Sequence, residues 1–176
     1  SITVAGVKTL FDYALILIHG TPGENGRLQG YLDMMGVSYS SCPMTSSVLT
    51  FDKITTKRTL AGTGIRMAPD LFLAAGETAD PGEVVRRLGL PLFVKPNASG
   101  SSFGVTKVTA CDQLPRAIAD ARTESDEVLI ESCVEGREIG CGVLVACGRE
   151  YLFPVTEIIS KHDFFDYEAK YTAGCS

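Results

Sequence analysis

The segment FVKPNASGSSFGV (residues 93–105) constrains the fold more than any other part of this 176-residue sequence. It begins as an apolar strand pattern that carries one lysine, Lys95, and continues as a loop of mostly small residues. Successive N–H groups and hydroxyls in such a loop can surround phosphate oxygens, while a lysine on the neighbouring strand supplies charge. Many loops of this composition are only turns, however. The segment alone therefore indicates a phosphate site without establishing one.

The sequence lacks the common signatures of nucleotide, metal and membrane sites. There is no G-x-x-x-x-G-K-[ST] motif, because Lys95 precedes the glycines, and the G-x-G-x-x-G fingerprint is missing. None of the six cysteines forms a C-x-x-C pair and there are only two histidines, so no zinc site is expected. Apolar runs such as YALILI (13–18) are too short to span a membrane. A net charge of −5 gives no general attraction for nucleic acid or anionic membranes.

Strand and helix patterns alternate along the chain, which favours an α/β fold. The run YALILI is continuous, as expected for a strand buried on both faces, and Pro69 opens an expected edge strand. Asp80, Pro81 and Glu83 supply an N-cap, a first-turn proline and a capping-box acid to one helix. Strands are expected at 13–18, 37–39, 68–74, 91–96, 104–108 and 127–132, and helices at 27–36, 51–64, 81–89 and 114–121.

Two further segments have a weaker pattern. SSCPMTSS (40–47) is polar and is expected to be a link between elements. From residue 136 to 158 the sequence alternates and predicts a hairpin in a second sheet, with its turn at CGRE (147–150).

Five segments together resemble one family. HGTPGENGRLQG (19–30), FDKITTK (51–57), LPLFVKPNASGSSFGVTKV (90–108), VLIESCVEGREI (128–139) and FFDYEAKYT (164–172) occur in the order found in D-alanine–D-alanine ligases, members of the ATP-grasp superfamily. The resemblance covers essentially the whole chain. It implies an α/β (α+β) ATP-grasp fold preceded by part of a Rossmann-like N-terminal domain. The implied parts are 1–45 from that domain, 46–134 as the central lobe, and 135–176 as the start of the C-terminal lobe.

The resemblance implies ligation of two D-alanines through an acyl phosphate, for peptidoglycan precursors. It also implies ATP with Mg²⁺ (or Mn²⁺) as cofactors, a homodimer, a cytoplasmic location, and no nucleic-acid or membrane partner. The alternatives are another ATP-grasp carboxylate–amine ligase, such as a D-alanine–D-lactate enzyme, and a non-catalytic ATP-binding module. We expect the chain to be a piece of a longer protein, and we expect this piece to lack both ends of that protein. The metal ligands are then expected beyond Ser176, with none assigned here, and the piece alone is not expected to catalyse ligation.

The resemblance also implies roles for residues near the substrates. His19 matches a histidine near the carboxylate of the first D-alanine, and Glu24 matches the acid that orients it. Lys57 and Lys95 match a pair that neutralises ATP phosphates. Gly100, Ser101, Ser102 and Gly104 match the loop that closes over the triphosphate, where Ser101 also positions substrate.

Further roles concern the adenine and a second loop. Residues 131–134 match the linker between the two lobes, whose backbone contacts adenine, and Glu138 matches the acid that accepts from ribose. Phe164 matches an aromatic residue near adenine. Lys170 matches a lysine at the γ-phosphate, and Tyr171 a tyrosine that bonds toward Ser101, which favours D-alanine over D-lactate as second substrate. The linker residues are Glu131, Ser132, Cys133 and Val134.

Overall fold

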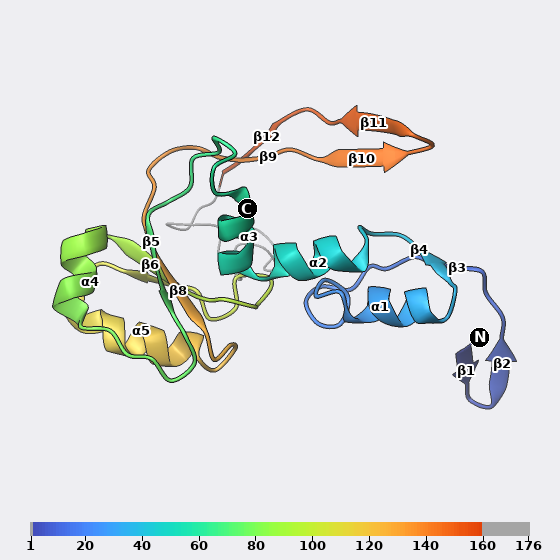
Figure 1. Cartoon of the computed structure of the whole chain (residues 1–176), viewed down its shortest axis with the longest axis horizontal. Helices are drawn as coiled ribbons and strands as arrows, with labels where there is room; N and C mark the ends of the chain where they lie inside the picture. Colours follow the sequence, from blue (N-terminus) through green and yellow to red (C-terminus); the bar gives the residue numbers. More distant parts are fainter. Residues whose placement is uncertain (1, 160–176) are drawn as a thin grey trace.

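The computed structural model describes residues 2–159, which form a small N-terminal unit, a central sheet with helices, and extended C-terminal strands (Figure 1). The N-terminal unit contains β1 (Ile2–Val4), β2 (Val7–Thr9), β3 (Tyr13–Ala14), α1 (Arg27–Met34), β4 (Ser38–Tyr39) and α2 (Met44–Phe51). β1 and β2 form an antiparallel hairpin, whereas β3 and β4 pair in parallel through the crossover helix α1. No helix in the described range combines the length and apolar character that a bilayer crossing requires.

α1 and α2 approach closely at a glycine. Gly26 caps α1 with a left-handed φ of 81°. A Cβ on Gly26 would lie 2.6 Å from Val48 Cγ2 and 3.0 Å from the carbonyl oxygen of Met44. Both the backbone conformation and the packing of α2 therefore require glycine at this position.

The central unit is a four-stranded antiparallel sheet in the order β5-β8-β6-β7. Figure 1 shows α4 and α5 on one side of this sheet and α3 on the other. The strands are β5 (Asp70–Leu73), β6 (Leu92–Pro96), β7 (Thr106–Val108) and β8 (Val128–Ser132). The helices are α3 (Lys53–Leu60), α4 (Pro81–Leu88), the 3₁₀ turn η1 (Cys111–Gln113) and α5 (Leu114–Ala121).

The apolar core lies between the sheet and the pair α4 and α5. Alternate residues of β6 point into it, so Leu92 and Val94 are fully buried while Phe93 and Lys95 face the side of α3. The remaining core side chains come from β5, β7, β8, α4 and α5: Leu73, Val84, Leu88, Val108, Leu114, Ala117, Ala121, Val128 and Ile130. Because one face of the sheet is covered by this apolar core, polar groups can lie only on the opposite face, the side of α3.

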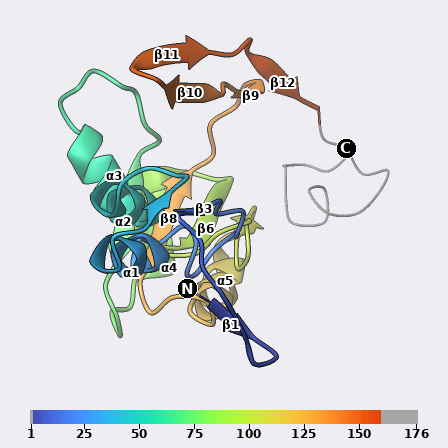
Figure 2. The ribbon, with the colours of Figure 1, turned by 90° about the vertical axis from the view of Figure 1, so that its right-hand side faces the viewer.

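The last described strands form two antiparallel pairs. β9 (Glu138–Gly140) pairs with β12 (Thr156–Ile158), and β10 (Val143–Ala146) with β11 (Arg149–Leu152). Figure 2 shows β10 and β11 extending away from the central sheet. Cys147 and Gly148 form the turn, both with positive φ, as a two-residue hairpin turn requires. This confirms the hairpin predicted from the alternating sequence.

Two sequence-based expectations for the elements were wrong. The strand expected at 13–18 is only two residues long, and Leu15 and Leu17 are 69% and 82% exposed, because no described element covers them. The link expected at 40–47 is partly helical, because α2 begins directly after Pro43 and ends at Phe51, so the helix expected from residue 51 begins only at Lys53, as α3. The break lies at Asp52, which is extended and whose carboxylate accepts from Thr55 N–H at 2.7 Å, capping α3.

Candidate functional site

The glycine–serine loop (residues 97–105) forms one wall of a cavity of about 330 Å³, which we call the loop cavity. β6 contributes Phe93 and Lys95, α3 contributes its first residue Lys53, and β9 contributes Glu138. The remaining lining residues are 99–103 and Val105. Two lysines therefore line one cavity bounded by a loop rich in N–H groups and hydroxyls, which is an arrangement suited to an anion.

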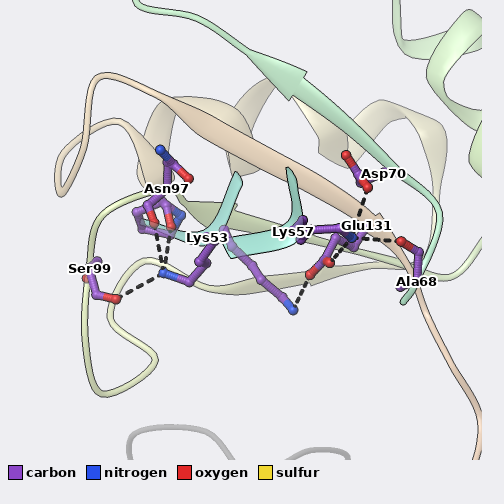
Figure 3. A network of polar contacts seen from close by, with 9 residues as sticks. Lys53, Lys57, Ala68, Asp70, Asn97, Ser99 and Glu131 are labelled. Carbon is purple, nitrogen blue, oxygen red and sulfur yellow. Dashed lines mark hydrogen bonds and ion pairs between the residues drawn. The ribbon is translucent and has the colours of Figure 1, made fainter. Parts of the chain in front are cut away.

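Lys53 connects α3 to the glycine–serine loop. Its amine donates to the carbonyl oxygens of Pro96 at 2.9 Å, Asn97 at 3.2 Å and Ser99 at 2.9 Å (Figure 3). Burial, and after it the positive charge of Lys95, lowers the pKa of the Lys53 amine to about 8. An anion in the cavity would therefore stabilise a proton that Lys53 holds less tightly than an ordinary lysine does.

Asn97 holds the base of the loop in place. Its side chain is fully buried, and its Oδ1 accepts from Ile54 N–H at 2.9 Å. Its Nδ2 donates to Asp52 at 2.9 Å and to Glu127 at 2.8 Å. The buried amide uses both of its donors and an acceptor, so it fixes the start of α3, and with it Lys53, against the end of β6.

A second cavity, the histidine cavity, adjoins the first and has a volume of about 430 Å³. It is lined by His19, Glu24, Thr50, Phe51, Lys53 and residues 99–101. Gly100 lies directly against the N-terminal unit, since a Cβ there would be 3.2 Å from Glu24 Oε2 and 3.5 Å from Gly20 Cα. Glu24 in turn accepts from Gly20 N–H, which shapes the loop that carries His19. The structure thus brings together His19, Glu24, Gly100 and Ser101, which the sequence places far apart.

The loop backbone has an unusual conformation. Ser101 and Ser102 both have positive φ values, 52° and 62°. This left-handed conformation costs a non-glycine residue roughly 1 kcal/mol or more. Two consecutive serines in it turn the chain sharply at the wall of the loop cavity, with Ser101 also lining the histidine cavity.

Lys57, to which the resemblance gives a role at the phosphates, contacts two carboxylates on the central sheet. Its amine contacts Glu131 at 2.7 Å, Asp70 at 2.9 Å and the carbonyl oxygen of Ala68 at 2.7 Å (Figure 3). It does not line the loop cavity, whereas Lys53, one helical turn earlier, does. The two lysines share one face of α3, so the sequence alone could not distinguish them. The i, i+4 spacing indicates only that either lysine could face the site.

The predicted linker continues β8 out of the sheet. Glu131 contacts Lys95 at 2.6 Å through one carboxylate oxygen. Ser132 N–H donates to the carbonyl oxygen of Pro69 and Cys133 N–H to that of Pro91, at 3.0 and 3.1 Å. Ser132 Oγ donates to the carbonyl oxygen of Leu88. These bonds anchor the linker to the central unit, and the exposed Val134 follows them.

Of the other predicted site residues, one lines the loop cavity and three lie outside residues 2–159. Glu138 lies on the wall of the loop cavity. Phe164, Lys170 and Tyr171 lie outside the described residues. Within residues 2–159, no three His, Cys, Asp or Glu side chains converge in a manner that could hold a metal ion.

Two residues at the centre of the site were missed from the sequence. Lys53 lies in the segment FDKITTK (51–57), in which the resemblance gives a role to Lys57 alone. Asn97 lies at the start of the glycine–serine loop, and no local pattern distinguishes a buried amide from a turn residue there. Its role becomes visible only when α3 is packed against β6.

Comparison with known proteins identifies the family. Residues 60–176 match the sequence profile of the family described as D-ala D-ala ligase C-terminus. A D-alanine–D-alanine ligase of Phocaeicola vulgatus is 52% identical over 166 residues, which are 94% of this chain and 51% of that protein. One of Flavobacterium psychrophilum is 47% identical over 97% of this chain and 52% of its own length. The chain thus spans about half the length of the relatives it matches.

Solved structures agree with this result. D-alanyl-alanine synthetase A of Vibrio cholerae has a TM-score of 0.79 and 34% identity, over 86% of this chain and 47% of its own. The VanG D-Ala:D-Ser ligase of Enterococcus faecalis has a TM-score of 0.79 and 36% identity, over 92% and 47%. These relatives confirm the expected α+β fold of ATP-grasp type. The chain therefore belongs to the D-alanine–D-alanine ligase family.

Proposed function

We propose that the protein containing this chain uses ATP to join two D-alanines, through an acyl phosphate, into the dipeptide used for peptidoglycan. The observation that carries this proposal is that Lys53 and residues 99–101 line both cavities. A nucleotide phosphate in the loop cavity and a carboxylate in the histidine cavity would then meet at one shared wall. Phosphoryl transfer depends mainly on such positioning and on neutralisation of charge.

The loop cavity fits a polyphosphate. Lys53 and Lys95 supply positive charge from α3 and β6, and Gly100, Ser101 and Ser102 supply N–H groups and hydroxyls. This assignment replaces Lys57 by Lys53. A divalent cation, Mg²⁺ or Mn²⁺, would add further charge neutralisation at the phosphates when bound, and we expect its ligands beyond the described residues.

The adenine is proposed to lie at the linker after β8. The N–H groups of Ser132 and Cys133 already donate to carbonyl oxygens of the central unit. We therefore propose that the next N–H group, that of Val134, donates to the base. The carbonyl groups of the linker would accept from the exocyclic amine. Glu138, on the wall of the loop cavity, would accept from the ribose hydroxyls. Glu131, Cys133 and Phe164 would border the base.

The histidine cavity is proposed to bind the first D-alanine. His19 would contact its carboxylate, and Glu24 would hold the loop of His19 in place. Ser101 would orient the carboxylate toward the phosphate. Lys170 would meet the γ-phosphate, and Tyr171 would bond toward Ser101.

The proposed chemistry has two steps. A carboxylate oxygen of the first D-alanine attacks the γ-phosphorus, and the bond to the β-phosphate oxygen breaks to release ADP. The amine of the second D-alanine then attacks the acyl carbon, the amine loses a proton, and inorganic phosphate leaves. Closure of the glycine–serine loop would exclude water, which would otherwise hydrolyse the acyl phosphate.

The organisation of the whole protein is also proposed. Residues 1–45 belong to a substrate-binding N-terminal domain, 46–134 to the central lobe and 135–176 to the C-terminal lobe. We expect the complete protein to be a homodimer and to act in the cytoplasm, where ATP is available.

The proposal is tested by measuring ADP release by the full-length protein with D-alanine, L-alanine, D-serine or D-lactate. D-serine is included because a structural relative is a D-Ala:D-Ser ligase. We expect release that depends on D-alanine alone, together with formation of the dipeptide. Release with D-alanine only when D-lactate is added would instead indicate a depsipeptide ligase, and ATP binding without release a non-catalytic module.

A further inference from the structure

Two carboxylates face each other on the polar side of the central sheet. Asp70 on β5 and Glu131 on β8 are direct cross-strand partners in the antiparallel register. Their side chains are only 26% and 14% exposed. Like charges directly opposite each other on neighbouring strands repel and destabilise the pair. The pair therefore requires a cation between the two strands.

Lys57 supplies that cation from α3. Its side chain is 12% exposed, and its amine contacts both carboxylates and the carbonyl oxygen of Ala68, so its donors are directed to fixed acceptors. Burial lowers the pKa of Lys57, but hydrogen bonds to Glu131 and Asp70 outweigh burial and raise it above the ordinary value. The amine is thus charged and fixed in place.

Glu131 divides its two oxygens between two lysines. Oε1 accepts from Lys57 at 2.7 Å, and Oε2 accepts from Lys95 at 2.6 Å. Burial raises the pKa of Glu131, but the hydrogen bonds from Lys57 and Lys95 outweigh burial and keep it below the ordinary value. A charged carboxylate thus connects a lysine outside the loop cavity to a lysine on its wall.

We propose that Lys57 is a positioning residue: it holds one oxygen of Glu131, so that the other oxygen holds the Lys95 amine at the wall of the loop cavity. The inference rests on the proposed function, because it takes the loop cavity to bind the ATP phosphates. Without Lys57, Asp70 repels Glu131, and the Glu131 carboxylate attracts the Lys95 amine alone instead of two amines. The Lys95 amine is then drawn away from the phosphates.

The test compares Lys57→Met, Lys57→Arg and Lys8→Met in the full-length protein. Lys8→Met is the matched control, because Lys8 is an exposed lysine on β2. The ATP dissociation constant is measured by calorimetry with magnesium present and D-alanine absent. We expect Lys57→Met to weaken ATP binding about tenfold, which corresponds to roughly 1.4 kcal/mol. Lys57→Arg should restore most of the affinity, and kcat and the KM for D-alanine should change less than about twofold.

A double variant separates positioning from a merely structural role. If Lys57 acts through Glu131, Lys57→Met should have little further effect on ATP affinity in a Glu131→Gln background. An equal loss of affinity in both backgrounds would overturn the inference. So would unchanged ATP affinity in Lys57→Met, or a loss that is matched by the KM for D-alanine. If Lys57→Met does not fold, Lys57→Arg decides instead. A folded Lys57→Arg that binds ATP as poorly as Glu131→Gln would overturn the inference.

The outcomes also distinguish this inference from the proposed function. Wild-type protein that binds ATP but releases no ADP with D-alanine contradicts the proposed function, while the ATP affinities of the variants still decide the role of Lys57. Wild-type protein that binds no ATP contradicts both.

Discussion

The amine of Lys53 donates to the carbonyl oxygen of Ser99 at 2.9 Å, which joins the first residue of α3 to the loop that closes the cavity. Replacement by glutamine removes the charge and shortens the reach. We expect Lys53→Gln to raise the KM for ATP about 10- to 100-fold, because hydrogen bonds to charged groups contribute roughly 1.5–3 kcal/mol. Steady-state kinetics of the full-length protein measure this effect. A KM within twofold of the wild-type value would show that Lys53 does not contact the phosphates.

The low pKa of Lys53 predicts proton uptake when ATP binds. The pKa of about 8 in the free protein should rise when phosphate lies beside the amine. Only the protonated amine attracts phosphate, so this contribution to affinity is present below pH 8 and is lost as the pH rises above it. At pH 8 about half a proton should be taken up per ATP.

Calorimetry in two buffers of different ionisation enthalpy measures that uptake. Lys53→Gln should abolish the uptake at pH 8, since its side chain does not titrate. Equal uptake by the wild type and Lys53→Gln would assign the proton to another group.

Ser101 combines a hydroxyl with a left-handed backbone, and two substitutions separate them. Ser101→Ala removes the hydroxyl and keeps the strained φ of 52°, whereas Ser101→Gly removes both. If the hydroxyl orients substrate, both variants should lower kcat/KM for D-alanine by about 10- to 100-fold, the loss of one or two hydrogen bonds. Full activity in Ser101→Gly alone would show that loop conformation, rather than the hydroxyl, matters.

Gly26→Ala should destabilise the N-terminal unit through two effects. The left-handed φ of 81° costs alanine about 1 kcal/mol, and the new Cβ would lie 2.6 Å from Val48 Cγ2. We expect a total of about 2–4 kcal/mol in the free energy of unfolding of the full-length protein, measured with denaturant.

Gly36→Ala is the matched control for that measurement. Gly36 also has a positive φ, 65°, but a Cβ there would meet nothing within 4 Å. The Gly36→Ala variant should lose only about 1 kcal/mol of unfolding free energy, the cost of the left-handed backbone. Equal losses in the two variants would show that α1 and α2 do not pack as closely as the structure indicates.

Local sequence signals predicted the elements of the central unit well. The cap of α4 is formed by Asp80, whose carboxylate accepts from Glu83 N–H at 2.8 Å, with Pro81 in the first turn. The strand opened by Pro69 is β5, which lies at the edge of the sheet as predicted. In each case the physical cause is local, so a few adjacent residues suffice to predict it.

Signals that depend on packing were missed. α2 contains serine and threonine and follows a proline, so its sequence resembles a loop, yet it packs between α1 and α3. The choice between Lys53 and Lys57 depends on where α3 begins, which Asn97 fixes from β6 through Asp52 and Ile54. Contacts between separate elements decide both, and in the second case they join residues more than forty positions apart, so no local pattern records them.

The cluster of Lys57, Lys95, Asp70 and Glu131 has consequences for how related sequences diverge. Two positive and two negative side chains meet in a partly buried space, where a single unbalanced charge is costly. Substitution at one of these positions should therefore persist mainly when another position changes with it. We expect a relative that has lost the acid at position 70 to have lost the lysine at position 57 as well. Positions 57 and 70 should therefore covary among related sequences.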